Sequence, residues 1–80
     1  MKKHYQLLAT NYGRNYHDKT TPPTPHKDEI IEYLFDQLIK DNIDSKQARA
    51  LADNLPIDAA LVIPQGDGGY TRYEITTVTQ

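Results

Sequence analysis

The chain has 80 residues, with 11 acidic and nine basic side chains and no cysteine. This length suffices for one small domain with a thin core. The lack of cysteine excludes disulfides, thiolate nucleophiles and cysteine metal sites, and it fits a reducing compartment. No apolar run approaches the ~18 residues that a membrane helix needs, and no apolar segment follows the N-terminal lysines. We therefore expect a single soluble, cytoplasmic domain over residues 1–80, with no membrane partner.

Charge is unevenly distributed along the chain. Residues 1–27 carry a net charge of +4, residues 28–67 carry −6, and the remainder is neutral. Such a division gives one surface an attractive field for a polyanion and another surface a repulsive one. It affects partners and encounter rates rather than the fold.

The first predicted element is a strand over residues 4–12, HYQLLATNY, which ends at Gly13. Tyrosines, leucines and threonine are frequent in strands, and the apolar side chains fall on both faces, as in an inner strand. Residues 13–24 are polar and end in the sequence TTPPT. Prolines favour extended geometry and remove amide donors, so we expect a long Pro- and Thr-rich loop here. Loops of this length often carry a function.

An amphipathic helix is the clearest element of the sequence. Apolar side chains repeat at i, i+3, i+4 and i+7 from Ile30 to Ile39, which describes one face of a helix running to about Lys40. Thr24 is expected to be the N-cap, with Pro25 at the first helical position.

A second, shorter helix is predicted directly after the first. Asn42 can adopt the left-handed conformation that ends a helix. Asp44 and Gln47 then form a variant of the capping box, which marks a new helix start. The sequence NLP at positions 54–56 ends this helix.

Two C-terminal strands complete the prediction. Residues 57–63 (IDAALVI) and 70–78 (YTRYEITTV) alternate in the manner of strands, and PQGDGG between them suits a hairpin turn. In the last strand the face with Arg72 and Glu74 is expected to be solvated. We predict an α+β fold of order β-α-α-β-β: a three-stranded sheet with a C-terminal antiparallel hairpin and one long amphipathic helix packed on one face.

Catalytic and metal chemistry find little support in the residue pattern. The glycines at 66–69 precede a strand rather than a helix and lack a following Lys-Ser or Lys-Thr, so a phosphate loop is not indicated. His4, His17 and His26 fall on separate elements without ligand spacing. We expect no enzyme, no metal site and no cofactor, because convergent acid and base groups in a cleft are not indicated.

Two surface features are candidates for partner binding. Asp28, Glu32 and Asp36 recur at i, i+4 and i+8, which forms one acidic column on the first helix. Successive members are ~6 Å apart along the axis, close to the phosphate spacing of one nucleic-acid strand. Such a column can occupy a protein that normally grips nucleic acid, although charged residues also cover the solvent side of any amphipathic helix.

The second feature is basic and rich in tyrosine. Tyr12, Arg14 and Tyr16 lie in the positively charged N-terminal part, and cations interleaved with aromatic rings are typical of single-strand binders. Tyrosines also occur in strands for packing reasons, and the whole chain is acidic, with a pI of about 5.8.

In size, acidity and lack of motif, the chain resembles as a class the small inhibitors encoded by phages and mobile elements, anti-CRISPR proteins among them. The resemblance covers no aligned residues. The leading interpretation is a non-enzymatic protein-binding inhibitor or regulator, with a nucleic-acid-handling complex as the target of its acidic helix face. The alternative is a nucleic-acid-binding module that uses the N-terminal segment. Open sheet edges also permit a homodimer.

Overall fold

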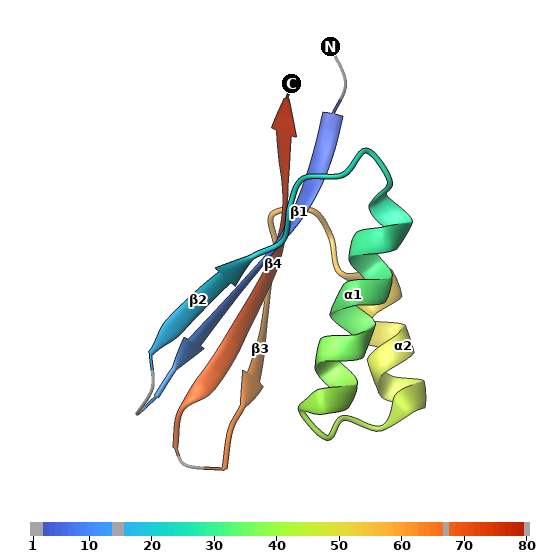
Figure 1. The fold of residues 1–80 in the computed structure, drawn as a ribbon. Coiled ribbons are helices and arrows are strands. Elements are labelled where there is room, and N and C mark those ends of the chain that lie inside the picture. Colours follow the sequence, from blue (N-terminus) through green and yellow to red (C-terminus); the bar gives the residue numbers. More distant parts are fainter. Residues whose placement is uncertain (1–2, 14–15, 67, 80) are drawn as a thin grey trace.

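An antiparallel sheet with both helices on one of its faces forms the fold (Figure 1). The computed structural model describes residues 3–13, 16–66 and 68–79. In chain order the elements are β1 (Lys3–Tyr12), β2 (His17–Thr20), α1 (Lys27–Lys40), α2 (Ser45–Asn54), β3 (Ala60–Pro64) and β4 (Tyr70–Thr79). The four-stranded sheet has the order β2-β1-β4-β3. The predicted α+β class is thus confirmed.

The predicted number of strands is wrong. β2 lies inside residues 13–24, which were expected to form a loop, and pairs with β1 so that Leu8 is opposite Thr20 and Asn11 opposite His17. All four β2 side chains are exposed. An edge strand without a buried face has no apolar alternation, so its sequence carries no strand signal of the usual kind.

The helices match the predicted segments, with one difference at the first start. α1 begins at Lys27 after the N-cap His26, so Thr24 is not the N-cap and Pro25 is not the first helical residue. Thr24 nevertheless accepts a hydrogen bond from the His26 N–H at 3.2 Å. The predicted left-handed Asn42 is confirmed by its φ of 66°. The Asp44 cap is also confirmed, because its carboxylate accepts hydrogen bonds from the Lys46 and Gln47 amides.

The C-terminal strands form the predicted hairpin. β3 starts at Ala60 rather than at residue 57, because Asp58 has a φ of 66°, which is incompatible with a continuous strand. In β4 the side chains of Thr71, Tyr73 and Ile75 are buried and alternate with more exposed ones. This alternation confirms which face of β4 turns toward the helices.

The core lies between the helices and the central strands. Leu7 of β1, Leu34 and Leu38 of α1, and Ile75 of β4 are the largest fully buried side chains. They belong to a single cluster of buried apolar residues. Leu34 and Leu38 are one turn apart and therefore face the sheet together, which fixes α1 against β1 and β4.

Candidate functional site: a groove between the edge strand and the first helix

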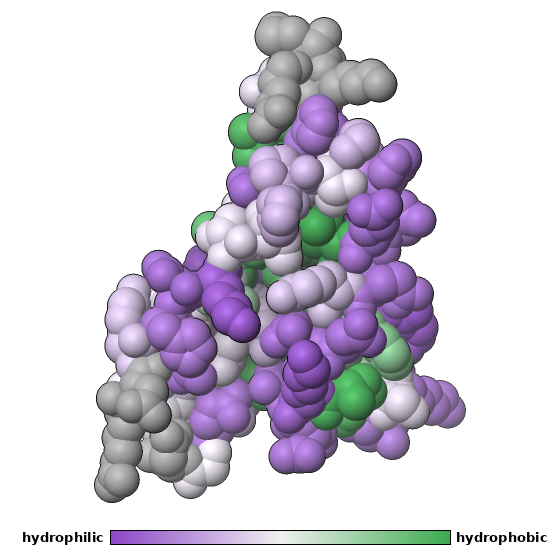
Figure 2. Space-filling view, viewed as in Figure 1, coloured by the Kyte–Doolittle hydropathy of each residue, from purple (hydrophilic) through white to green (hydrophobic). Residues whose placement is uncertain are grey.

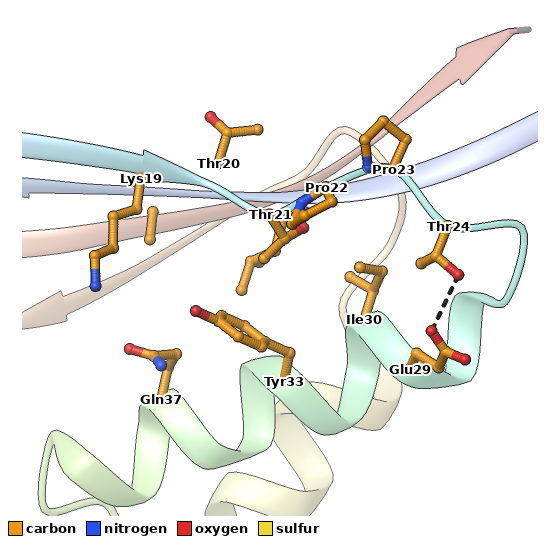
Figure 3. Close-up of a pocket in the computed structure, with 12 residues that line it drawn as sticks. Lys19, Thr20, Thr21, Pro22, Pro23, Thr24, Glu29, Ile30, Tyr33 and Gln37 are labelled. Carbon is orange, nitrogen blue, oxygen red and sulfur yellow. Dashed lines mark hydrogen bonds between the residues drawn. The ribbon is translucent and has the colours of Figure 1, made fainter.

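A groove opens between α1 and the segment that contains β2. Its volume is about 620 Å³. Leu7 and Ala9 of β1 and Ile30 of α1 contribute its apolar lining, and Tyr33 of α1 extends its ring toward the strands (Figure 3). Figure 2 shows apolar surface exposed between the sheet edge and the helix, within a surface that is largely hydrophilic. We call this feature the β2–α1 groove.

Residues 21–24 form the wall of the groove opposite α1 and are fixed to β1 by hydrogen bonds. The Thr21 N–H donates to the Leu7 carbonyl at 3.1 Å, and the Leu7 N–H donates to Thr21 Oγ1 at 3.0 Å. Further along, Tyr5 and Thr24 exchange two backbone hydrogen bonds of 2.7 and 3.0 Å. Pro22 and Pro23, between these anchors, line the groove. The prolines restrict the backbone and the hydrogen bonds to β1 hold it in place, so this wall keeps its position although no other described element packs on it.

The two ends of the groove differ in charge. At one end Thr24 Oγ1 donates a hydrogen bond of 3.0 Å to Glu29 Oε2 (Figure 3). At the other end the ammonium group of Lys19 and the side-chain amide of Gln37 lie together (Figure 3). Within the described part of the chain, Lys19 forms no ion pair. The groove is therefore apolar in the middle, acidic at one end and cationic at the other.

Beyond Lys19 the groove continues into a smaller polar cavity of about 210 Å³. There the buried Tyr73 donates its hydroxyl proton to Asp41 Oδ2 at 2.5 Å. Burial, together with this hydrogen bond, raises the pKa of the Tyr73 hydroxyl well above its usual value. The contact ties central strand β4 to the end of α1. It thereby fixes the helix that forms one wall of the groove.

The backbone of β2 has hydrogen-bonding groups on its outer side. Because the Thr21 N–H points to β1, alternation along the strand directs the Lys19 N–H to β1 as well. The N–H and C=O groups of Asp18 and Thr20 then point away from the sheet. β2 is the last strand on this side in the described sheet, so these groups lack a strand partner.

The predicted acidic column is present on α1 but is not entirely free. Asp28, Glu32 and Asp36 are all exposed. Glu32 accepts two hydrogen bonds from Arg49 of α2, at 3.0 and 2.6 Å. These bonds lower the pKa of the Glu32 carboxyl group and raise that of the Arg49 guanidinium. The middle of the column therefore joins the two helices. Among the described residues Asp28 and Asp36 form no ion pair, although Asp36 also acts electrostatically on Arg49.

Arg49 is also held by other groups on the helices. Its guanidinium carbon lies 4.2 Å from the centroid of the Phe35 ring, and its Nε is 3.6 Å from Asp53 Oδ1. A cation shared between Glu32, Asp53 and a ring partly neutralises the acidic surface at its centre. Net charge along the sequence did not reveal this pairing, because it depends on how α1 and α2 pack.

The predicted tyrosines lie elsewhere, on the sheet face without helices. Tyr12 stacks on Tyr70 with ring centroids 4.8 Å apart, and Tyr16 meets Tyr12 edge-on at 5.5 Å. Arg14 lies outside the described residues. Tyr12 and Tyr16 are thus brought together, but away from both the acidic column and the groove.

The sequence did not predict that Tyr33 and Lys19 line the same groove, nor that Tyr70 stacks on Tyr12. Tyr33 is spaced four residues from Glu29 and from Gln37, so a groove-facing column at 29, 33 and 37 could be read from the helix period. The sequence alone did not show that this column faces a groove, because the opposite wall follows β2, which was not predicted. Tyr70 directly follows the expected hairpin turn, which was the available signal.

Other kinds of site receive no support from the described residues. Among them, no cluster of three or more histidine and acidic side chains could hold a metal ion. No helix in the described ranges is long and apolar enough to span a membrane. Comparison with family models, with curated proteins and with solved structures gave no match.

Proposed function

We propose that the protein is a non-enzymatic protein-binding domain that acts as an inhibitor or regulator and engages its partner through the β2–α1 groove. The observation that carries this proposal is an exposed apolar groove of about 620 Å³ beside an open sheet edge. Apolar clefts with a few polar groups at their ends are typical ligand sites, and open edges recruit extended chains.

The shape of the groove favours a polymer over a small substrate. Its lining residues come from an edge segment on one side and from successive turns of α1 on the other, so it is elongated along the helix (Figure 3). The Glu29 carboxylate at one end already accepts a hydrogen bond from the Thr24 hydroxyl. The charged groups at the two ends are separated by apolar surface, which suits recognition better than acid–base catalysis at one reacting atom.

The acidic column supports a choice of partner class. Asp28 and Asp36 are exposed on the helix that forms the groove wall, although they do not line the groove themselves. Exposed charge near an interface mainly accelerates association with an oppositely charged surface. A partner with a basic surface, such as a protein that handles nucleic acid, would be attracted by this field. The class resemblance to phage and mobile-element inhibitors agrees with such a target.

The test is affinity capture with a matched pair of tyrosine variants, performed with and without nuclease. Tyr33 is 41% exposed in the groove and Tyr70 is 40% exposed on the opposite sheet face. Each substitution by Ala therefore removes a tyrosine side chain, and the two side chains are exposed to a similar degree. We expect a stoichiometric protein that survives nuclease treatment, is lost from Tyr33→Ala and is retained by Tyr70→Ala. A partner that is retained by Tyr33→Ala and lost from Tyr70→Ala would refute the groove as the binding site.

Binding of single-stranded nucleic acid is the second candidate function. It is favoured by the Tyr12–Tyr70 stack and by Arg72, which projects from the same face of β4 and pairs with Glu74 at 3.1 Å. Bases can stack on such rings. This function predicts that a fluorescent oligonucleotide binds at low ionic strength, that salt weakens the binding, and that Tyr70→Ala abolishes it. Binding that is unchanged in Tyr70→Ala would exclude the stack as its site.

A further inference from the structure

We propose that the partner contributes an extended peptide segment that adds to the free edge of β2 as a further, antiparallel strand and places alternate side chains in the β2–α1 groove. This inference rests on the proposed function, since it specifies how the same groove binds a protein. Its occupant is a short segment with a basic group on its N-terminal side, apolar side chains in the middle and an acidic group on its C-terminal side.

The first argument is the backbone of the edge. The N–H and C=O groups of Asp18 and Thr20 point away from β1, and no hydrogen bond to them occurs within the described ranges. An added strand offers such groups in the matching pattern, and main-chain bonds then provide affinity that does not depend on sequence. Pro22 lacks an N–H and ends this edge. The paired segment is therefore short.

The second argument is the position of the apolar surface. A strand added to β2 would lie ~4.8 Å from it and direct every second side chain toward the helix side of the sheet. On that side it meets Tyr33 and Ile30, which Figure 3 shows facing the strands from α1. The remaining side chains would point to the opposite face. Backbone pairing and side-chain burial can therefore be satisfied by the same extended chain.

The third argument is charge, which sets the direction. β2 runs from the Lys19 end of the groove toward the Glu29 end (Figure 3). An antiparallel segment starts near Glu29 and ends near Lys19 and Gln37, so a basic group at its start and a carboxylate at its end meet opposite charges. Lys19 and Thr24 are five positions apart, which corresponds to about 16 Å of extended chain at ~3.3 Å per residue. About five or six partner residues fill this length.

The test uses a phage-displayed library of random dodecamer peptides, selected on the full chain. We expect the enriched peptides to share a basic residue, then alternating apolar positions, then an acidic residue. Synthetic copies of these peptides should also bind the chain when free of the phage. Thr20→Pro removes one outward N–H and leaves the pairing with β1 intact. It should weaken these peptides by about fivefold or more, the equivalent of one net hydrogen bond.

The matched control is Val62→Pro. By the same alternation, the Val62 N–H points outward from β3, the opposite edge of the sheet. This variant should bind the peptides as the unchanged chain does. Equal loss in both variants, or no loss in Thr20→Pro, would overturn strand addition at β2. A library that yields no shared pattern would overturn it as well.

A second measurement does not depend on the folding of a variant. In hydrogen exchange on the unchanged chain, a bound peptide should slow the Asp18 and Thr20 amides, whereas the Lys19 amide, already directed to β1, should change little. Slowing of all three to the same degree, or of none, would contradict the proposal.

The outcomes separate this inference from the function on which it rests. A captured protein that is lost from Tyr33→Ala but retained by Thr20→Pro would preserve the groove as a binding site and refute strand addition. Retention by both variants would refute both proposals. Light scattering provides the remaining comparison: a dimer of the unchanged chain that Thr20→Pro converts to a monomer would identify a second copy as the occupant and overturn the proposed partner.

Discussion

Replacing Tyr73 with Phe tests whether one hydrogen bond anchors the groove helix to the sheet. The side chain is 2% exposed, and its hydroxyl donates to Asp41 Oδ2 at 2.5 Å. Asp41 caps the C-terminal end of α1, where an acidic group is unfavourable for the helix dipole. The hydroxyl offsets that cost. The substitution removes the donor and leaves the ring in place.

The expected loss is about 1.5–2 kcal/mol of unfolding free energy. Hydrogen bonds to charged groups contribute ~1.5–3 kcal/mol, and the lower part of this range applies because the partly exposed Asp41 can recover water. For a domain of this size the loss corresponds to a fall of about 6–16 °C in Tm. Urea and thermal unfolding followed by circular dichroism measure both quantities. Tyr70→Phe, an exposed position, should change the free energy by less than ~0.5 kcal/mol.

The pH dependence of the same variant gives an independent check. The pKa of Tyr73 is raised in the folded chain, so above pH ~10 the unfolded chain loses this proton while the folded chain keeps it. The contribution of Tyr73 to stability is therefore complete below pH ~10 and is lost as the pH rises, by about 1.4 kcal/mol per pH unit. The difference in unfolding free energy between the unchanged chain and Tyr73→Phe should therefore fall to zero within about one and a half pH units above pH ~10. A difference below ~0.5 kcal/mol at neutral pH, or one that persists in alkali, would refute the reasoning.

Three further predictions concern the helix ends and the acidic column. Asp44→Ala should lower the unfolding free energy by ~1 kcal/mol, because two amide hydrogen bonds are lost, whereas Ser45→Ala should change it little; urea titration compares them. Asn42→Ala should cost ~1 kcal/mol at its φ of 66° and Asn42→Gly almost nothing; equal effects would contradict the left-handed assignment. Asp28→Lys with Asp36→Lys should slow association with the captured partner and leave dissociation nearly unchanged, measured by surface plasmon resonance at two salt concentrations. Faster dissociation alone would exclude a steering role.

Helices and their ends could be predicted because their signals are local. The stripe that contains Leu34 and Leu38 specifies which side of α1 is buried, whatever it packs against. Asn42 and Asp44 act on backbone groups within a few residues. The alternation around Tyr73 is likewise visible in the sequence because one face of β4 is buried and the other is not. Each of these features needs no knowledge of distant parts of the chain.

The candidate site could not be predicted because it depends on β2. This strand exposes all of its side chains, and the hydrogen bonds of Thr21 and Thr24 to β1 fix the segment that follows it. Pairing with β1 therefore requires no apolar pattern in residues 17–20. The acidic column shows the same limit: spacing predicted its alignment on α1, but only the packing of α2 brings Arg49 to Glu32.

The property that hid β2 from sequence analysis is also what makes it suitable for binding. A strand that buries no side chain gains little from the core, so its backbone edge and the apolar surface beside it stay accessible. α1 is held against β1 and β4 by Leu34, Leu38 and the Tyr73–Asp41 bond, and it does not close over β2. A partner strand added at this edge would bury Tyr33 and also form hydrogen bonds with the outward backbone groups of Asp18 and Thr20. The prolines at 22 and 23 limit how far such pairing can extend, which restricts the edge to a short segment and disfavours open-ended aggregation.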